Sequence, residues 1–392
     1  MTRNTEVVVI GGGYAGVLAA NRLTQRDDVT VTLINPRPDF VERIRLHQLV
    51  AGTHVAVAGY RDVLAESIVL TVDTVTRIEA AERRVALASG GTVGYDYLIY
   101  AVGSGSAGPN VPGAAQFAYP LAGLEEARRL QAVLDAAPAS APVTVVGAGP
   151  TGMETATELA EAGRAVTLVC GGVLGPYLHP RARRSVAKRL ARLGVTVLDA
   201  PTVTAVTREA VWLSDGRELP SAVTVWTAGF SVPDLAARSG LRTDAVGRLL
   251  TEETLTSLDD DRIVAAGDSA APSGLPFRMS CQAAVQLGPQ AADTVLSRIA
   301  GEAPAPLAMA MAALCLSLGR RAGLYQFARR DDVAVRYFVG GHPGAKIKEF
   351  ICRGILGQLA KEARKPGSYG YPAWLMDGRR RQLLRSPERV ES

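Results

Sequence analysis

The chain is short of cysteine and of aromatic residues. Its 392 residues include only 4 cysteines, and 5% are Phe, Trp or Tyr. The cysteines, Cys170, Cys281, Cys315 and Cys352, are too few and too scattered for a disulfide scaffold or a CxxC metal site. We therefore expect a reduced, intracellular setting and no bound metal ion.

Long apolar runs are also missing. The apolar stretch at residues 303–319 contains two prolines and falls short of the ~20 apolar residues that a membrane-spanning helix needs. The apolar run Val7–Ile10 begins so early that we expect no secretory leader before it. We expect a cytoplasmic protein, with peripheral attachment to the inner face of the cell membrane as an alternative.

Acidic residues are outnumbered by basic ones in the C-terminal part of the chain. The net charge is +5, but residues 301–392 carry 16 Lys and Arg against 8 Asp and Glu, so the first 300 residues are slightly acidic. A basic tail is typical of a segment that meets a membrane surface or another polyanion, and equally of one that only keeps a protein soluble. Both interpretations stay open.

What is present is a globular composition rich in glycine. A length of 392 residues predicts two or three domains, and 47% hydrophobic with 21% charged residues excludes disorder, collagen and coiled coil. The 40 glycines exceed the usual share of about 7%. Extra glycine indicates the tight strand-to-helix turns that phosphate-binding folds need.

A strand–turn–helix–strand pattern occurs twice along the chain. The first copy has a turn at 11–16 between strands 6–10 and 29–34, and the second has a turn at 147–152 between strands 143–146 and 165–169. Both turns match GxGxxG, in which the glycines allow a tight turn, close approach to a pyrophosphate and close helix packing. The duplication predicts two nucleotide-binding domains.

The position that usually binds the ribose is not acidic in either copy. An Asp or Glu about 20 residues past the turn ordinarily accepts hydrogen bonds from the ribose hydroxyls. The first copy has Asn35 there, and the second has Cys170 followed by two glycines. An arginine nearby would accommodate the extra phosphate of NADPH, and Arg181, Arg183 and Arg184 follow a little further on. The sequence leaves NADH against NADPH open.

Five ordered blocks between residues 5 and 300 resemble the flavoproteins with two dinucleotide-binding domains. The blocks are 11–16, 95–103, 147–154, 227–229 and 263–268. Within this group the chain is most similar to type II NADH dehydrogenases and apoptosis-inducing-factor-like quinone reductases, and more distantly to the pyridine nucleotide-disulfide reductases. The resemblance implies an α/β fold with two Rossmann-like domains, one for FAD (1–110 and 234–300) and one for NAD(P)H (111–233). Residues 301–392 would form a basic C-terminal α+β domain that contacts a membrane or a dimer partner.

The same resemblance assigns residues to the cofactors. The cofactor-binding residues would be Gly11, Gly13, Ala15, Gly16, Asn35, Arg43, Val75, Ala101, Gly103, Gly147, Gly149, Gly152, Gly229 and Asp268. Asp268 would accept hydrogen bonds near the ribitol chain of FAD, unless it only caps a helix. Glu154 would lie near the nicotinamide, unless it is a solvent-facing acid favoured by the helix dipole.

Two departures from the related families argue against a subfamily that uses reactive cysteines. Disulfide reductases carry a CxxxxC pair after the first βαβ unit, whereas residues 40–48 contain no cysteine. Cys170 lies at the ribose position and Cys352 in the basic tail, so neither fits the reactive cysteine pair of sulfide:quinone oxidoreductases. Arg43, Arg45 and His47 are expected to line the flavin pocket or to form an ordinary helix face.

The acceptor side is suggested by residues 281–288. They resemble AQxAxQxG, the quinone-site motif of type II NADH dehydrogenases, with Cys281 in place of the leading Ala. Gln282 and Gln286 are four residues apart and would share one helix face. The alternative is an ordinary helix packed under the flavin.

The tail contains a basic amphipathic segment at residues 346–365. Its stripe consists of Ile347, Phe350, Ile351, Ile355 and Leu359, flanked by Lys and Arg. Such helices lie on anionic membranes, although the same stripe could cover the protein body or a dimer partner.

The resemblance implies an FAD-dependent NAD(P)H:quinone oxidoreductase. Hydride would pass from NAD(P)H to flavin N5, and two electrons would then pass to a quinone, with Glu154, Gln282 and Gln286 as catalytic residues. The expected partners are NAD(P)H, a quinone, an anionic membrane surface and a second copy of the chain, without nucleic acid. The alternatives are an NAD(P)H-dependent reductase of a ferredoxin- or rubredoxin-type protein and an NAD(P)H-sensing flavoprotein with slow turnover.

Overall fold

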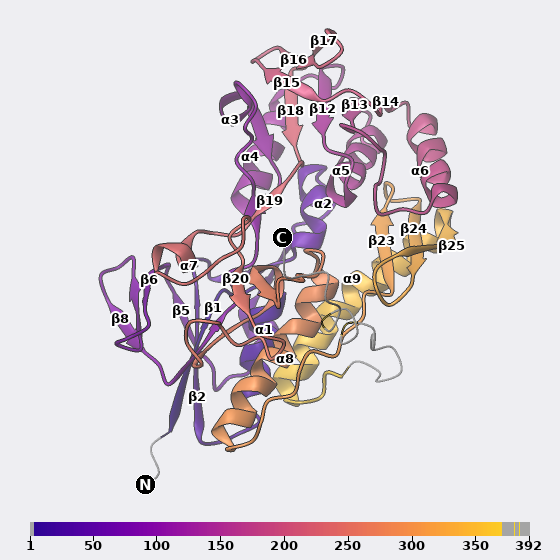
Figure 1. Ribbon diagram of the computed structural model, residues 1–392. Helices are drawn as coiled ribbons and strands as arrows, with labels where there is room; N and C mark the ends of the chain where they lie inside the picture. Colours follow the sequence, from indigo (N-terminus) through magenta and orange to yellow (C-terminus); the bar gives the residue numbers. More distant parts are fainter. Residues whose placement is uncertain (1–3, 371–379, 381–383, 385–392) are drawn as a thin grey trace.

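Two five-stranded parallel sheets repeat one arrangement in the computed structural model, which describes residues 4–370, 380 and 384. Figure 1 shows the two sheets in separate bodies, one above the other. In sheet order, the first contains β21 (Ile263–Ala265), β9 (Tyr97–Tyr100), β1 (Thr5–Ile10), β2 (Val29–Asn35) and β5 (Val69–Val72). The second contains β11 (Ala118–Pro120), β18 (Val223–Trp226), β12 (Pro142–Val146), β13 (Ala165–Val169) and β14 (Thr196–Leu198).

The apolar runs of the two repeats become the central strands of these sheets. In β1 the run Val7–Ile10 is buried, and in β12 so is the run Val143–Val146. Continuous apolar runs are typical of parallel strands covered on both faces. Val7 pairs with Val31 of β2, and Val143 pairs with Val166 of β13. The predicted α/β class with two Rossmann-like units is confirmed.

Each nucleotide-binding unit also contains a small antiparallel sheet. The first is formed by β6 (Val75–Glu79), β7 (Arg84–Leu87) and β8 (Thr92–Gly94), and the second by β15 (Val203–Val206), β16 (Ala210–Leu213) and β17 (Glu218–Pro220). Three two-stranded sheets pair β3 (Asp39–Val41) with β4 (Val57–Gly59), β10 (Gly105–Ser106) with β19 (Phe230–Ser231), and β20 (Leu249–Thr251) with β22 (Ala270–Pro272).

Helices connect strands of the sheets. The helices are α1 (Tyr14–Leu23), α2 (Leu46–Val50), α3 (Ala114–Phe117), α4 (Leu124–Ala136), α5 (Pro150–Glu161), α6 (Pro180–Arg192), α7 (Leu235–Arg238), α8 (Cys281–Ile299) and α9 (Gly341–Arg364). α1 packs against both α8 and α9. α8 can approach α1 closely because Gly288 faces the backbone of Ala15, where a Cβ would collide. Within the described part of the chain, no helix is long and apolar enough to cross a membrane.

The C-terminal segment joins both cores. It forms a three-stranded antiparallel sheet of β23 (Ala313–Ser317), β24 (Gly323–Ala328) and β25 (Ala334–Gly340), followed by α9. Leu316 and Leu324 belong to the core of the second sheet, whereas Met311 and Leu359 belong to the core of the first. The predicted tail domain therefore packs against both nucleotide-binding units. The last part of that prediction, residues 371–379, 381–383 and 385–392, lies outside the described residues.

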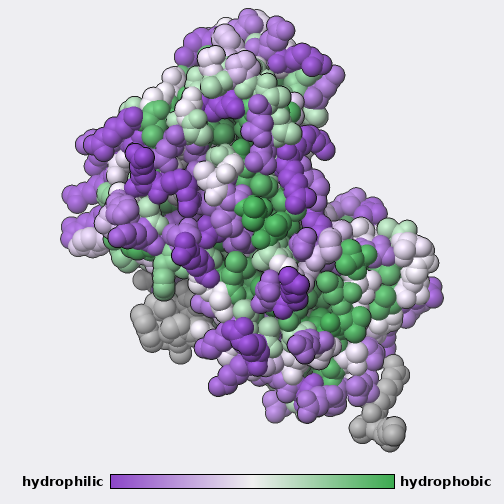
Figure 2. All heavy atoms as spheres, turned by 180° about the vertical axis from the view of Figure 1, so that it is seen from behind, coloured by the Kyte–Doolittle hydropathy of each residue, from purple (hydrophilic) through white to green (hydrophobic). Residues whose placement is uncertain are grey.

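The predicted amphipathic stripe of α9 is mostly turned toward the protein. Leu359 is fully buried, and Ile351 and Ile355 are half-buried, whereas Phe350 is 77% exposed. The stripe as a whole is therefore not a free membrane face, because α9 packs against α1 and β24. On the face opposite to that of Figure 1, the surface is largely hydrophilic, with an apolar band across its middle (Figure 2).

Candidate active site

The two glycine-rich turns have the same geometry. Gly11 and Gly147 have left-handed φ angles of +101° and +105°, and their N–H groups donate to the carbonyls of Ile34 and Val169 at 2.8 and 2.9 Å. A Cβ on Gly16 or Gly152 would collide with the carbonyl oxygen of the first glycine of its turn. Each turn therefore requires glycine at its first and third positions.

The second glycine of each turn faces open space. A Cβ on Gly13 or Gly149 would meet no protein atom within 4 Å. Helices α1 and α5 begin directly after these glycines, with no side-chain cap and no acid in the first turn. Unpaired N–H groups and the positive end of a helix dipole at such a space favour an anion. The residues at both turns thus fit the pyrophosphate of a dinucleotide.

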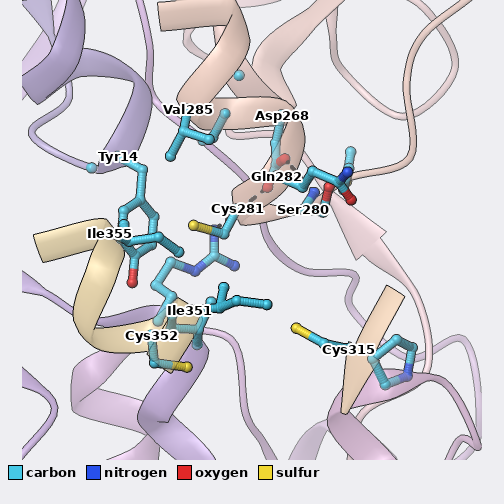
Figure 3. Close-up of a pocket in the computed structure, with 18 of the residues that line it drawn as sticks. Tyr14, Asp268, Ser280, Cys281, Gln282, Val285, Cys315, Ile351, Cys352 and Ile355 are labelled. Carbon is cyan, nitrogen blue, oxygen red and sulfur yellow. Dashed lines mark hydrogen bonds and ion pairs between the residues drawn. The ribbon is translucent and has the colours of Figure 1, made fainter. Parts of the chain in front are cut away.

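The N-termini of α1 and α5 reach the same cavity, which has a volume of about 550 Å³. Figure 3 shows its wall: Cys281, Gln282 and Val285 of α8 lie opposite Ile351, Cys352 and Ile355 of α9, with Tyr14 of α1 and Cys315 of β23 at the sides. The cavity thus receives side chains from both nucleotide-binding units and from the C-terminal segment.

About half of the predicted site residues line this cavity. They are Gly13, Ala15, Arg43, Ala101, Gly103, Glu154, Asp268 and Gln282. Gly16, Gly149, Gly152 and Gly229 are chain neighbours of lining residues, and Gly11 and Gly147 are the first residues of the same two turns. The cofactor roles assigned to these residues stay predictions.

Three predicted residues lie elsewhere. Asn35 is the last residue of β2, where its side-chain oxygen accepts the N–H of Gly12 at 2.9 Å. Val75 is the first residue of β6 in the small antiparallel sheet. The Gln286 amide lies beneath the cavity wall, where its Nε2 donates to the carbonyls of Ala310 at 3.1 Å and Gln282 at 3.0 Å. Gln282 and Gln286 thus do not face the cavity together, because the segment before β23 binds the second amide.

Asp268 occupies one wall of the cavity in a small polar cluster. Its carboxylate accepts hydrogen bonds from the Ser104 hydroxyl at 2.7 Å and from the Ser280 N–H at 3.0 Å. The Arg43 guanidinium lies 3.7 Å from the same carboxylate. Asp268 therefore does not cap its own short helix, and its carboxylate is held in place from three sides.

Glu154 is a buried member of an ion pair rather than a solvent-facing acid. The Lys348 ammonium lies 3.0 Å from its carboxylate, the Ser317 N–H donates to it at 2.9 Å, and His47 Nδ1 lies 3.7 Å away. Burial raises the pKa of Glu154, but the charge of Lys348 and the hydrogen bond from the Ser317 N–H help to outweigh burial and leave the pKa below its ordinary value. Glu154 is thus ionised at the cavity wall.

Two buried polar atoms of the cavity wall have no hydrogen-bond partner among the described residues. They are the hydroxyl of Tyr14 and Nε2 of His47. Burial lowers the pKa of His47 to about 4, so its imidazole is neutral near neutral pH. Buried polar groups are ordinarily hydrogen-bonded, so both atoms are free to bond to a ligand.

Three of the four cysteines, Cys281, Cys315 and Cys352, line the cavity, although Cys352 was not expected there because it lies in the basic tail. Cys352 reaches it because α9 folds back over α1. All three are free thiols. Burial raises their pKa values, that of Cys352 to about 11. They are therefore protonated near neutral pH and are weak nucleophiles.

Lys348 is not among the residues predicted from the sequence, and it lies 194 residues from Glu154 along the chain. One signal was available. The buried residues of α9 are Gly344, Lys348, Cys352, Leu359 and Glu362. A lysine that shares a helix face with small and apolar residues indicates a buried charge with a partner. The identity of that partner depends on the fold alone.

Comparisons with known proteins agree with this geometry. The family model described as pyridine nucleotide-disulphide oxidoreductase matches residues 5–293. A NADH dehydrogenase-like protein of Mycobacterium tuberculosis is 31% identical over 359 residues, covering 82% of this chain and 87% of the relative. The type II NADH:quinone oxidoreductase of the same organism is 29% identical, covering 77% and 74%. The structure of the sulfide:quinone oxidoreductase of Aquifex aeolicus matches with a TM-score of 0.78 at 19% identity, covering 93% of each chain.

The family model covers well over half of the chain, including both glycine-rich turns and the Asp268 cluster. The resemblance seen in the sequence is confirmed at this level. The chain is an enzyme that belongs to the pyridine nucleotide-disulphide oxidoreductase family.

Proposed function

We propose that the chain is an FAD-dependent NAD(P)H:quinone oxidoreductase. The observation that carries the proposal is the convergence of the two turn helices, α1 and α5, on one cavity. The turn at Gly11–Gly16 would hold FAD, and the turn at Gly147–Gly152 would hold NAD(P)H. Bound there, FAD would supply the two-electron chemistry between NAD(P)H and an acceptor.

The acceptor end of the cavity favours a flat apolar molecule. Val285 of α8 and Ile351, Ile355 and Phe350 of α9 line it, and few charged side chains stand among them. Pockets for such ligands are mostly apolar with a few polar groups that orient them. Gln282 and the unpartnered Tyr14 hydroxyl are polar groups of this kind. A relative that is 29% identical is named a type II NADH:quinone oxidoreductase, which also supports a quinone.

The ion pair of Glu154 and Lys348 gives the cavity a polar wall. Lys348 holds the carboxylate in place from the C-terminal segment, while Glu154 projects from the first turns of α5 beside Pro150 and Thr151. This pair would orient the polar part of a substrate and keep an ionised carboxylate at the meeting point of the two units.

Separate measurement of the two half-reactions of the Gln282→Leu variant tests the quinone assignment. Anaerobic stopped-flow mixing with NAD(P)H should reduce the flavin at the wild-type rate. Reoxidation by a soluble quinone should slow by a few-fold to about tenfold, the effect of one lost hydrogen bond of about 0.5–1.5 kcal/mol.

Gln286→Leu is the matched control on the same helix. It removes the amide that binds Ala310, so it should lower stability while leaving reoxidation by quinone nearly unchanged in the folded protein. If Gln282→Leu slows neither half-reaction, the quinone assignment of α8 is wrong. If it slows both equally, Gln282 supports the flavin instead.

The presence of three cysteines at the cavity suggests a second candidate function, that of a flavoprotein that exchanges electrons with a sulfur compound, although their protonation state counts against it. Such chemistry requires a thiolate, whereas burial raises the pKa of Cys281, Cys315 and Cys352. Rapid flavin reduction by sulfide in the wild type, lost on changing Cys315 and Cys352 to Ser, would favour this candidate over the NAD(P)H reaction.

A further inference from the structure

The strand end that usually carries the acid for the adenosine ribose carries Cys170 in the second nucleotide-binding unit. β13 ends at Val169, whose carbonyl accepts the N–H of Gly147 at 2.9 Å. Cys170 is therefore the first residue beyond the strand, directly beside the phosphate-binding turn. In a Rossmann unit this place separates NADH from NADPH, through an acid in one case and a nearby arginine in the other. A half-buried thiol is neither.

A carboxylate from the neighbouring strand lies beside this thiol. The Cys170 N–H donates to the Leu198 carbonyl at 2.8 Å, and the Gly172 N–H donates to the Asp199 carbonyl at 2.6 Å. β14 runs parallel to β13 and ends at Leu198, so Asp199 leaves the sheet at the same edge as Cys170. Burial, the charge of Asp199 and a hydrogen bond between the two side chains together raise the pKa of the Cys170 thiol to about 12. The Asp199 carboxylate therefore lies close to Cys170.

The space around this carboxylate is open. Asp199 is exposed, and it has no ion pair with any cation of the described residues. Gly171 and Gly172 have φ angles of +68° and +147°, and a Cβ on Gly172 would meet no protein atom within 4 Å. No side chain of these two residues stands between Asp199 and the edge of the turn.

The arginines that could take an extra phosphate lie on a helix whose N-terminal end contacts the C-terminal sheet. Arg181, Arg183 and Arg184 lie in the first turns of α6. The N-terminal end of that helix is fastened to the C-terminal sheet, because the His179 N–H donates to the Gln326 side chain of β24 at 3.3 Å. Arg183 also donates to the carbonyl of Leu178 at 3.3 Å. These contacts draw the basic end of α6 toward the C-terminal segment.

We propose that Asp199, positioned by β14, replaces the missing strand-end acid and makes the second site selective for NADH over NADPH. The carboxylate accepts hydrogen bonds from the ribose hydroxyls, and like charge repels a 2′-phosphate at the same place. The inference rests on the proposed function only in requiring that the turn at Gly147–Gly152 binds a nicotinamide dinucleotide.

Equilibrium binding tests this inference without relying on turnover. Calorimetric titration of the purified flavoprotein with NAD⁺ and with NADP⁺ gives a ratio of dissociation constants for each variant. We expect the wild type to bind NAD⁺ at least about tenfold more tightly, and Asp199→Asn to reduce this ratio by about tenfold, the effect of one charged hydrogen-bond acceptor. Glu209→Gln removes an exposed acid elsewhere in the same unit and should leave the ratio unchanged.

A rescue variant separates a local role from a general change of charge. Adding Cys170→Asp to Asp199→Asn restores an acid at the usual strand end, so the preference for NAD⁺ should return. The inference is overturned if the wild type binds NADP⁺ as well as NAD⁺, if neither binds, or if Asp199→Asn and Glu209→Gln change the ratio equally. Selective NAD⁺ binding without flavin reduction by NADH would overturn the proposed function and support this inference.

Discussion

At the scale of single residues, the cavity depends on buried charges that balance one another. Lys348 neutralises Glu154 at 3.0 Å, whereas His47 remains neutral because burial lowers its pKa to about 4. An imidazole proton would add a second positive charge beside Lys348 in a buried site. Acid should therefore weaken the structure around the cavity before it affects the exposed surface.

The first prediction concerns the effect of His47 on the pH dependence of stability. Its pKa is about 4 in the folded protein against an ordinary value of 6.5, so the unfolded chain binds the proton more readily between these values. Stability should fall by about 2 kcal/mol as the pH drops from about 7.5 to about 5. The midpoint of thermal unfolding should decrease less over this range in His47→Asn than in the wild type. His342→Asn, which changes an exposed histidine, should behave as the wild type, and equal pH dependence of all three would refute the assignment.

Single site residues could be predicted from the sequence wherever a local sequence pattern identifies them. The turn glycines follow from their spacing, and Asp268 follows from its place at a strand end. The partners of Glu154 and Gln286 could not be predicted, because Lys348 and Ala310 reach them only through the packing of the C-terminal segment.

At the scale of elements, α9 connects the C-terminal segment to the cavity. Its buried face supplies Lys348 and Cys352 to the cavity, and its far end is fixed by Glu362, which lies 3.4 Å from Arg22 and accepts the N–H of Gly367 at 2.8 Å. Removal of the whole helix would open the cavity, so a truncation cannot isolate a membrane role. A single exposed residue is the better probe.

Phe350 provides that probe for membrane contact. It is 77% exposed at the mouth of the cavity, and an exposed aromatic residue beside Lys and Arg favours an anionic membrane surface. Phe350→Glu should weaken binding to anionic liposomes several-fold in a sedimentation assay, with residual binding that decreases with salt. Val69→Glu makes the same change at an exposed valine of β5 and should have little effect. If both variants bind like the wild type, α9 is not a membrane contact.

The strands and the first helices follow from sequence more readily than α9 does. Valine-rich runs bounded by glycine turns define β1, β12, α1 and α5. An amphipathic stripe only shows that a helix is covered on one side, and it does not say whether protein, lipid or a second chain covers it. The structure resolves this for Leu359, which packs in the first core.

At the scale of the whole molecule, a duplicated nucleotide-binding unit converges on one cavity. Four strands of each unit repeat one order, β9-β1-β2-β5 in the first and β18-β12-β13-β14 in the second, and the two turns share one geometry. The C-terminal segment contributes to both cores. This arrangement predicts that the turn at Gly11–Gly16 holds FAD and that the turn at Gly147–Gly152 binds NAD(P)H.

The central claim is tested most directly by flavin absorption of the wild type, Gly13→Val and Gly149→Val, recorded before and after anaerobic addition of NADH. Both glycines have extended backbone angles and open space at the Cβ position, so both variants should fold. The wild type should contain one FAD per chain, and NADH should bleach it. Gly13→Val should lack FAD, whereas Gly149→Val should keep FAD that dithionite reduces and NADH does not. Full flavin in Gly13→Val, or normal bleaching by NADH in Gly149→Val, would contradict the account.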